Sequence, residues 1–344
     1  MSHPAFFCVA FGVGTRNKKN EWLEVYYPAP LFQPEKSLVE KLGAIVGYTN
    51  GNTAISIEPT QVDAICEVLK AANIDTQLVA PLAQSQQPLV LTFLEEDSAL
   101  SSTPEAYLKL HLISLRHVKP HGTDLSGIFP LLPNVAWTNQ GAVDLAELPE
   151  RQLEARIKGE LLEVSSVDKF PKMTNYVVPA GVRIAHSARV RLGAYVGDGT
   201  TVMHEGFINF NAGTEGTSMI EGRISAGVIV GEGSDLGGGC STMGTLSGGN
   251  NVVISVGKNC LLGANAGLGI PLGDRCTIEA GLYITAGAKV NLLDDKNQLV
   301  STLKASELAG KPDLLFRRNS QTGTIECKAN RSAIALNEEL HAHN

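Results

Sequence analysis

Residues 178–208 read VPAGVRIAHSARVRLGAYVGDGTTVMHEGFI, and an aliphatic residue stands at every sixth position of this stretch. A period of six fits neither an α-helix nor a flat strand, whose side-chain periods are about 3.6 and 2.0. It is typical of a parallel β-helix, in which each rung of six residues is a short strand plus a corner. The periodic positions are Val178, Ile184, Val190, Val196, Val202 and Ile208.

The same period continues to Val290 with three interruptions. Later periodic runs cover 224–236, 256–268 and 272–290. The joints before these runs span sixteen, twenty and four residues, none of which is a multiple of six. Such slips indicate loops extruded from the coils or shortened corners, and a solenoid usually carries its function there. The joints run from Ile208 to Ile224, from Leu236 to Val256 and from Leu268 to Leu272.

Glycine is concentrated in the periodic segment, since 24 of the 35 glycines lie between Gly181 and Gly287. Corners of a narrow prism need positive φ or bare backbone, which glycine supplies. Small residues two positions before the aliphatic ones, namely Ala188, Ala194 and Thr200, suit a crowded interior. We therefore expect a mainly β protein built on a parallel β-helix, and by analogy with known hexapeptide prisms a left-handed one.

Composition excludes several classes of function. The chain has 344 residues and a net charge of −7 without a long basic run, which argues against nucleic acid and anionic membrane as partners. No stretch of 18 or more apolar residues occurs. Six scattered cysteines without a CxxC pair fit a reducing compartment, so we expect a cytoplasmic protein.

The chain is long enough for two or three modules. Residues 1–165 lack the period and predict an α/β N-terminal domain, 166–292 the β-helix, and 293–344 a small C-terminal cap and tail. In the first module, strands are predicted at 6–14, 22–28 and 89–94, and helices at 37–48, 59–73, 104–118 and 148–162.

The glycine-rich sequences do not match the motifs of nucleotide-binding loops. The glycine-rich runs at 12, 197 and 231 all lack the last glycine of a dinucleotide loop, and no Walker lysine follows them. His186 and His204 are eighteen residues apart, one full coil, so they should stack on one corner. No third ligand follows in the next coils, which favours a structural or surface pair over zinc.

Three polar clusters are candidates for chemistry. The first, NFNAGTEGTSMIEGRISAG (209–227), lies across the first slip and combines Glu215 and Glu221 with Arg223. A carboxylate beside an arginine could be a catalytic base with an anion-binding group, or it could be a surface ion pair. GGGCSTMG (237–244) offers backbone N–H groups for an oxyanion, or simply a corner with positive φ. LFRRNS (315–320) pairs two arginines, which suit phosphate or carboxylate recognition unless they form a solvated turn.

The run from VMHEGFINFNAGTEGTSMIEGR through GGGCSTMG and LLGANAGLGIPLGD to IEAGLYITAGAKV, LKASEL and LFRRNS closely resembles the longer branch of the 2,3,4,5-tetrahydropyridine-2,6-dicarboxylate N-succinyltransferase family. The resemblance covers roughly 174–320 strongly and 1–165 loosely. It implies transfer of succinyl from succinyl-CoA to the amino group of ring-opened tetrahydrodipicolinate, giving N-succinyl-2-amino-6-oxopimelate and CoA in the diaminopimelate and lysine pathway.

Site residues follow from the same resemblance. The catalytic glutamate of the motif S-M-[IV]-E-G-R falls on Glu221, and Arg223 would contact the acyl donor. The remaining donor-groove positions, with the basic ones placed for the CoA phosphates, would be Gly238, Ser241, Ala264, Glu279, Ala280, Gly287, Lys304, Arg317, Arg318, Asn319 and Ser320.

A metal is a further question raised by the resemblance. Some relatives hold Mg²⁺ on a threefold axis between an acidic residue at the position of Ala188 and one at the position of Glu205. Alanine occupies the first position here, so Glu205 is the one metal ligand that the resemblance offers, and the sequence leaves Mg²⁺ binding open.

An amine that attacks a thioester must lose a proton, and the developing oxyanion must be stabilised. Glu221 could be the base or could take the succinyl group as an anhydride, and direct attack is favoured because it avoids a labile intermediate. Alternatives are an amino-sugar or acetyl-CoA acyltransferase of the same fold, a zinc lyase with three histidines, and a scaffold. Triangular prisms pack round a threefold axis, so we expect a homotrimer with sites between subunits.

Overall fold

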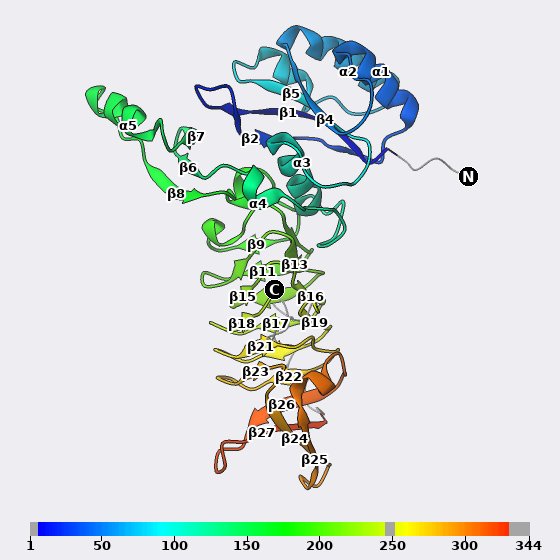
Figure 1. Ribbon diagram of the computed structural model, residues 1–344, viewed down its shortest axis with the longest axis vertical. Helices are drawn as coiled ribbons and strands as arrows, with labels where there is room; N and C mark the ends of the chain where they lie inside the picture. Colours follow the sequence, from blue (N-terminus) through cyan, green and yellow to red (C-terminus); the bar gives the residue numbers. More distant parts are fainter. Residues whose placement is uncertain (1–5, 245–251, 330–344) are drawn as a thin grey trace. The chain divides into compact units, whose positions relative to one another are not determined.

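The structure is a computed structural model that describes residues 6–244 and 252–329 (Figure 1). The chain divides into two compact units. The first contains Met1–Leu112 and Gly122–Pro171, and the second contains Ile113–His121 and Lys172–Asn344. Each unit has its own core.

The first unit is built on a five-stranded antiparallel sheet with the order β2-β1-β5-β4, in which β3 also pairs with β1. Side chains alternate between its faces, as the pleat of a strand requires. Its strands are β1 (Cys8–Arg16), β2 (Trp22–Tyr26), β3 (Leu31–Phe32), β4 (Thr53–Ile57) and β5 (Leu89–Leu94).

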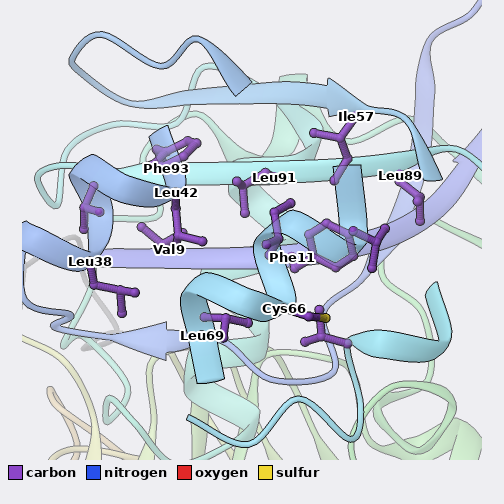
Figure 2. Close-up of a cluster of buried hydrophobic side chains, with 14 residues drawn as sticks. Val9, Phe11, Leu38, Leu42, Ile57, Cys66, Leu69, Leu89, Leu91 and Phe93 are labelled. Atoms are coloured by element: carbon purple, nitrogen blue, oxygen red, sulfur yellow. The ribbon is translucent and has the colours of Figure 1, made fainter. Parts of the chain in front are cut away.

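Two helices, α1 (Lys36–Val46) and α2 (Val62–Ala71), pack on one face of this sheet together with the 3₁₀ turns η1 (Pro59–Gln61) and η2 (Ala80–Gln84). Figure 2 shows the shared core, where Val9, Phe11, Leu91 and Phe93 of the sheet meet Leu38, Leu42 and Leu69 of the helices. Both helices were predicted, although the second begins as a 3₁₀ turn at Pro59.

Helix α3 (Thr103–Ser114) packs against residues of the opposite face. The Tyr27 hydroxyl, 2.7 Å from Thr92 Oγ1, donates to the Pro104 carbonyl at 3.1 Å. The Tyr27 N–H donates to Nε2 of the fully buried His111, whose Nδ1 lies 2.7 Å from the Tyr107 carbonyl. This ring is therefore neutral, and burial lowers the pKa of His111 to about 4.

A smaller antiparallel sheet completes the first unit in the order β7-β6-β8. Its elements are α4 (Ile128–Leu131), β6 (Val135–Thr138), β7 (Gly141–Asp144), α5 (Leu148–Ile157) and β8 (Val164–Asp168). The expected boundary at 165 falls inside β8, and this sheet was not predicted. Two predicted helices end early, because Arg116 and Gly159 adopt positive φ just beyond α3 and α5.

The second unit is a parallel β-helix whose coils stack one on another along the unit (Figure 1). Three ladders of short strands form its faces. We number the faces 1 to 3 in the order in which β10, β11 and β12 contribute to them. Face 1 contains β10 (Ala194–Val196), β13 (Ala212–Thr214), β16 (Ile229–Val230) and β19 (Ser255–Val256). Face 2 contains β9 (Arg183–Ile184), β11 (Thr200–Val202), β14 (Ser218–Ile220), β17 (Asp235–Leu236), β20 (Leu261–Leu262), β22 (Thr277–Ile278) and β26 (Leu314–Arg318).

Face 3 contains β12 (Phe207–Ile208), β15 (Arg223–Ile224), β18 (Ser241–Thr242), β21 (Gly267–Gly269) and β23 (Tyr283–Thr285). The periodic aliphatic side chains from Val190 to Val290 are buried inside the prism. The period predicts too early a start, however, because Val178 is 70% exposed and Ala188 is also exposed. The first coil strand is β9, preceded by η3 (Met173–Asn175) and followed by η4 (Ser187–Arg189).

The pairing register between successive coils shows where the three slips in the period lie. Regular coils advance eighteen residues, as from Ala194 to Ala212. Coils that include the first or third slip advance sixteen, as from Phe207 to Arg223 and from Leu261 to Thr277. The coil with the second slip advances twenty-six, and its extra residues lie between β18 and β19, partly outside the described residues.

The C-terminal strands continue the ladder of face 2 instead of forming a separate unit. Strand β26 pairs in parallel with β22 and antiparallel with β27 (Ile325–Ala329). Strands β24 (Lys289–Leu293) and β25 (Leu299–Lys304) extend this sheet, followed by η5 (Ala305–Leu308). These strands lie at the end of the prism, where the sequence predicts a cap over 293–344; residues 330–344 lie outside the described part of the chain.

Candidate functional site

Six corners join face 2 to face 3 and stack along one edge of the prism, which we call the site edge. Most of the residues singled out from the sequence lie on this edge or at the strand ends beside it, although they span more than a hundred positions. Its corners are residues 185–188, 203–206, 221–222, 237–240, 263–266 and 279–282.

Glu221 occupies the one short corner of the site edge among those that the structure describes. The corner between β14 and β15 has two residues, whereas the next corners on either side have four. The backbone is held closely: Glu221 N–H donates to the Leu236 carbonyl at 2.8 Å, and Arg223 N–H donates to the Cys240 carbonyl at 2.8 Å. This corner is therefore two residues shorter than its neighbours, and we call it the notch; Glu221 is its first residue.

The Glu221 carboxylate lies over the bare backbone of the next corner. A Cβ atom on Gly238 would lie 3.3 Å from Glu221 Oε2, so a side chain there would crowd the carboxylate. Gly238, which the resemblance placed in the donor groove, thus also keeps the space in front of Glu221 open.

Beneath the notch, Gly222 packs on Cys240. A Cβ on Gly222 would lie 2.3 Å from Cys240 Sγ and 2.7 Å from the Cys240 carbonyl oxygen. Cys240 is almost fully buried, and burial, with a smaller effect of the nearby Glu221 charge, raises the pKa of its thiol to about 12. The thiol is therefore a neutral packing group under the catalytic candidate and not a nucleophile.

Arg223 and Ser241 stand side by side on face 3, directly after the notch. They are register partners on β15 and β18, and Arg223 Nε and Nη2 donate to Ser241 Oγ at 3.0 and 2.7 Å. The guanidinium is exposed and fixed in direction by this hydroxyl. Such a group can receive a carboxylate or a carbonyl oxygen.

Small residues line the site edge beyond the notch. The Asn265 N–H donates to the Gly238 carbonyl and the Gly281 N–H to the Ala264 carbonyl, at 2.9 and 2.8 Å. Among the described residues, no hydrogen-bond partner is found for the N–H groups of Gly238, Ala264 and Ala280. These three N–H groups belong to residues with small or no side chains, so they form a set of backbone donors along the edge.

The far end of this row reaches the arginine pair of β26, where the two arginines differ. Glu279 accepts a hydrogen bond from the Arg318 N–H at 2.7 Å, and the Arg318 side chain is exposed. Arg317 instead makes an ion pair with the buried Glu326, with Nη2 2.8 Å from Oε2. Hydrogen bonds from Asn319 and from Arg317 lower the pKa of Glu326, which the sequence analysis did not single out.

The remaining donor-groove residues lie near this end without a shared contact. Lys304 is exposed at the end of β25, and its N–H donates to Glu307 at 2.9 Å. Gly287 and Ser320 are exposed, and a Cβ on Gly287 would meet nothing within 4 Å. Their role in binding stays a prediction.

Glu215 belongs to a different edge. It lies between face 1 and face 2, where the Lys119 ammonium is 2.7 Å from its carboxylate. The sequence placed Glu215 and Glu221 in one cluster, but corners six residues apart lie on different edges of a triangular coil. Glu215 is therefore a surface ion-pair residue.

Glu205 and the two histidines occupy the first two corners of the site edge. Glu205 is paired with Arg189 at 3.0 Å, and its side chain is 75% exposed. His186 and His204 hold equivalent places on adjacent coils, as their spacing predicts. Within residues 6–244 and 252–329, no three acidic, histidine or cysteine side chains gather closely enough to hold a metal ion. One chain alone thus does not offer the donor set that Mg²⁺ needs.

Comparisons with known proteins find relatives over nearly the whole chain. Residues 132–172 match the family profile described as tetrahydrodipicolinate N-succinyltransferase middle, and residues 249–286 match the hexapeptide repeat of succinyl-transferase. The chain is 68% identical over 341 residues, 99% of each chain, to the 2,3,4,5-tetrahydropyridine-2,6-dicarboxylate N-succinyltransferase of Pseudomonas paraeruginosa. Identity to the enzyme of the same name from Vibrio cholerae is 58%, over 99% of this chain and 100% of the relative.

A solved structure supports the same relationship. A putative 2,3,4,5-tetrahydropyridine-2-carboxylate N-succinyltransferase from Campylobacter jejuni superposes with a TM-score of 0.87 at 31% identity, covering 96% of this chain and 94% of that one. With the hexapeptide-repeat match, it confirms the predicted left-handed parallel β-helix. Among the described residues, no helix is both long enough and apolar enough to cross a membrane.

Proposed function

Since the chain belongs to the tetrahydrodipicolinate N-succinyltransferase family and is an acyltransferase of that kind, we propose that Glu221 is the carboxylate that catalyses the transfer. The reaction moves succinyl from succinyl-CoA to the amino group of ring-opened tetrahydrodipicolinate, in the diaminopimelate and lysine pathway. The observation that carries the assignment of Glu221 is the notch, which is the one short corner of the site edge in the part of the chain that the structure describes, and whose carboxylate lies next to the bare backbone of Gly238.

In the proposed step, the amine nitrogen bonds to the thioester carbonyl carbon while Glu221 takes the proton from that nitrogen. The C–S bond then breaks, and the leaving thiolate of CoA takes up a proton. The N–H of Gly238, for which no hydrogen-bond partner is found among the described residues, is proposed to stabilise the oxyanion. We favour this direct attack over an anhydride on Glu221, because an anhydride in an open notch would be exposed to hydrolysis.

The donor groove is proposed to follow the site edge from Glu221 to Arg318. Four coil steps separate the two positions, which is about 19 Å at roughly 4.8 Å per step. The exposed N–H groups of Gly238, Ala264 and Ala280 suit the amides of the pantetheine arm, and Arg318 suits the phosphates. Arg223, fixed by Ser241, is proposed to bind the acyl end of the donor.

We further propose a homotrimer, because flat prism faces pack round a threefold axis and closed symmetry leaves no open interface. Light scattering that gives three times 36.5 kDa would support it, and the mass of one or two chains would contradict it. All six cysteines are free and buried, which fits the proposed cytoplasmic location. Magnesium is left out of the proposal, because Glu205 is engaged by Arg189.

Glu221→Gln tests the catalytic assignment, because it keeps the size of the side chain and removes its basicity. We expect kcat to fall about 10²- to 10⁴-fold, with CoA affinity within twofold of wild type. Glu215→Gln is the matched control, since it changes a glutamate on another edge and should leave kcat nearly unchanged. A Glu221→Gln enzyme that kept more than about a tenth of the wild-type rate would contradict the proposal.

A further inference from the structure

Four outward-facing residues of face 3 stand in direct register, one on each successive coil. Arg223 pairs with Ser241, Ser241 with Gly267, and Gly267 with Tyr283. The column runs parallel to the site edge from the coil of Glu221, where Arg223 is also in register with Phe207 of the preceding coil. It therefore forms a wall beside the proposed donor groove, with a cation at one end and an aromatic ring at the other.

The Tyr283 ring occupies the place where a side chain on Gly267 would begin. A Cβ on Gly267 would lie 2.0 Å from Tyr283 Cδ2 and 2.1 Å from Cε2, so only glycine leaves room for the ring in this position. Even so, Tyr283 remains 44% exposed. Gly267 thus makes room for the ring, while Tyr283 stays partly exposed to solvent.

The position of the ring along the edge can be compared with the length of the donor. Because the ring leans from its own coil onto that of Gly267, it lies two to three coil steps from Arg223, roughly 10–14 Å. In an acyl-CoA, about eleven bonds separate the thioester carbon from the dimethyl carbon of the pantoate unit. Since an extended chain advances about 3.5 Å for every three bonds, this distance is about 13 Å.

We propose that the Tyr283 ring binds the pantoate dimethyl group of the acyl-CoA. The inference rests on the proposed function, because it assumes that the thioester lies at Glu221. The dimethyl group is the one bulky apolar part of the pantetheine arm, and the open part of a fixed aromatic ring buries it at low cost in conformational entropy. Gly267 acts as a positioning residue that holds the ring.

The test uses three variants of the full-length enzyme and two probes. Tyr283→Phe keeps the ring and should leave the KM for succinyl-CoA unchanged. Tyr283→Ala should raise that KM about tenfold, with kcat and the KM for the amine acceptor within about twofold of wild type. Gly267→Ala should raise it similarly, because the new methyl group displaces the ring. Tyr195→Ala is the matched control, since Tyr195 stands opposite Gly213 in the same register on face 1.

Binding of CoA and of adenosine 3′,5′-bisphosphate, which lacks the pantetheine arm, locates the contact. Tyr283→Ala should weaken CoA binding about tenfold and leave the bisphosphate unaffected. Equal weakening of both probes would place the ring against adenine, and an unchanged CoA affinity would remove it from the site; either result overturns the proposal. A change in the mass of the assembly would show a subunit contact and would also overturn it. An active Glu221→Gln enzyme, in contrast, would count against the proposed function alone.

Discussion

Gly222→Ala adds one methyl group directly beneath the proposed catalytic carboxylate. The new Cβ would lie 2.3 Å from Cys240 Sγ and 2.7 Å from the Cys240 carbonyl oxygen. Because unstrained contacts need about 3.5–4.0 Å, the two-residue corner must move outward by about 1 Å. Overpacking of this kind costs about 1–3 kcal/mol of folding stability.

The effect on catalysis should be larger than the effect on stability suggests. Glu221 is the other residue of that corner, so its carboxylate moves with the backbone of Gly222. A displacement of about 1 Å at a reacting centre can cost on the order of 10²-fold in rate. We therefore expect kcat for CoA release to fall about 100-fold, while the KM for succinyl-CoA changes little because the rest of the donor groove is untouched.

Gly231→Ala is the matched control for this experiment. Gly231 lies on the edge between face 1 and face 2, where a Cβ would be 2.7 Å from the Gly257 carbonyl carbon. It should lower the thermal midpoint as much as Gly222→Ala does, yet keep near wild-type kcat. The pair Gly222→Ala with Cys240→Ala should recover part of the lost rate, because the closest contact is removed. The reasoning is refuted if Gly222→Ala loses stability like the control but keeps more than half of the wild-type kcat.

Two further predictions concern charge. His111 has a folded pKa of about 4, below its usual 6.5, so its contribution of order 3 kcal/mol is present above pH 6.5 and is lost as the pH falls toward 4. His111→Gln should therefore be less stable than wild type at pH 7.5, and denaturation curves should show the difference shrinking toward pH 4.5; a constant difference would contradict a neutral ring facing the Tyr27 N–H. Arg318→Ala should raise the KM for succinyl-CoA and weaken its salt dependence, whereas Arg317→Ala should mainly lower the thermal midpoint, because it leaves Glu326 buried without its guanidinium. Equal effects of the two variants on the donor KM would show that the ion pair opens to bind phosphate.

The β-helix could be predicted from the sequence because its interior repeats. Each inward position between Val190 and Val290 faces the same narrow core, so one rule of aliphatic residues at a period of six holds for the whole ladder. The rule is wrong at Val178, where no coil lies beneath the side chain to bury it. A period marks which residues can face a core, and only contacts decide where the core begins.

The first unit was less predictable because its elements are short and differ from one another. The helices α1 and α2 have an apolar stripe that faces the sheet, and the sequence revealed both. The sheet of β6, β7 and β8 has no such pattern, since its strands have four or five residues and one face is partly exposed. Its register depends on pairing across about thirty residues, as between Trp137 and Ser166, which local sequence does not encode.

At the candidate site, spacing located the slip but not its geometry. The sequence placed Glu215, Glu221 and Arg223 in one cluster, while the coil puts Glu215 on another edge with Lys119. The arginines of β26 looked alike in the sequence, and Glu326, nine residues after Arg317, separates their roles. Such partners lie on neighbouring strands, so their distance along the chain carries no signal of contact.

A repeat fold makes its corners alike, and a catalytic group must be unlike its neighbours. Along the site edge, four-residue corners of successive coils stack at equal spacing. In the proposed function, their backbone N–H groups form a row of equivalent donors for an extended ligand. Such a row fixes the direction of the donor but gives no reason for the reaction to occur at one rung. In the proposed function, the two-residue corner at Glu221 supplies that reason, because it differs from its neighbours and places a carboxylate beside the bare backbone of Gly238. The proposed function thus assigns the chemistry to the irregularity in the period.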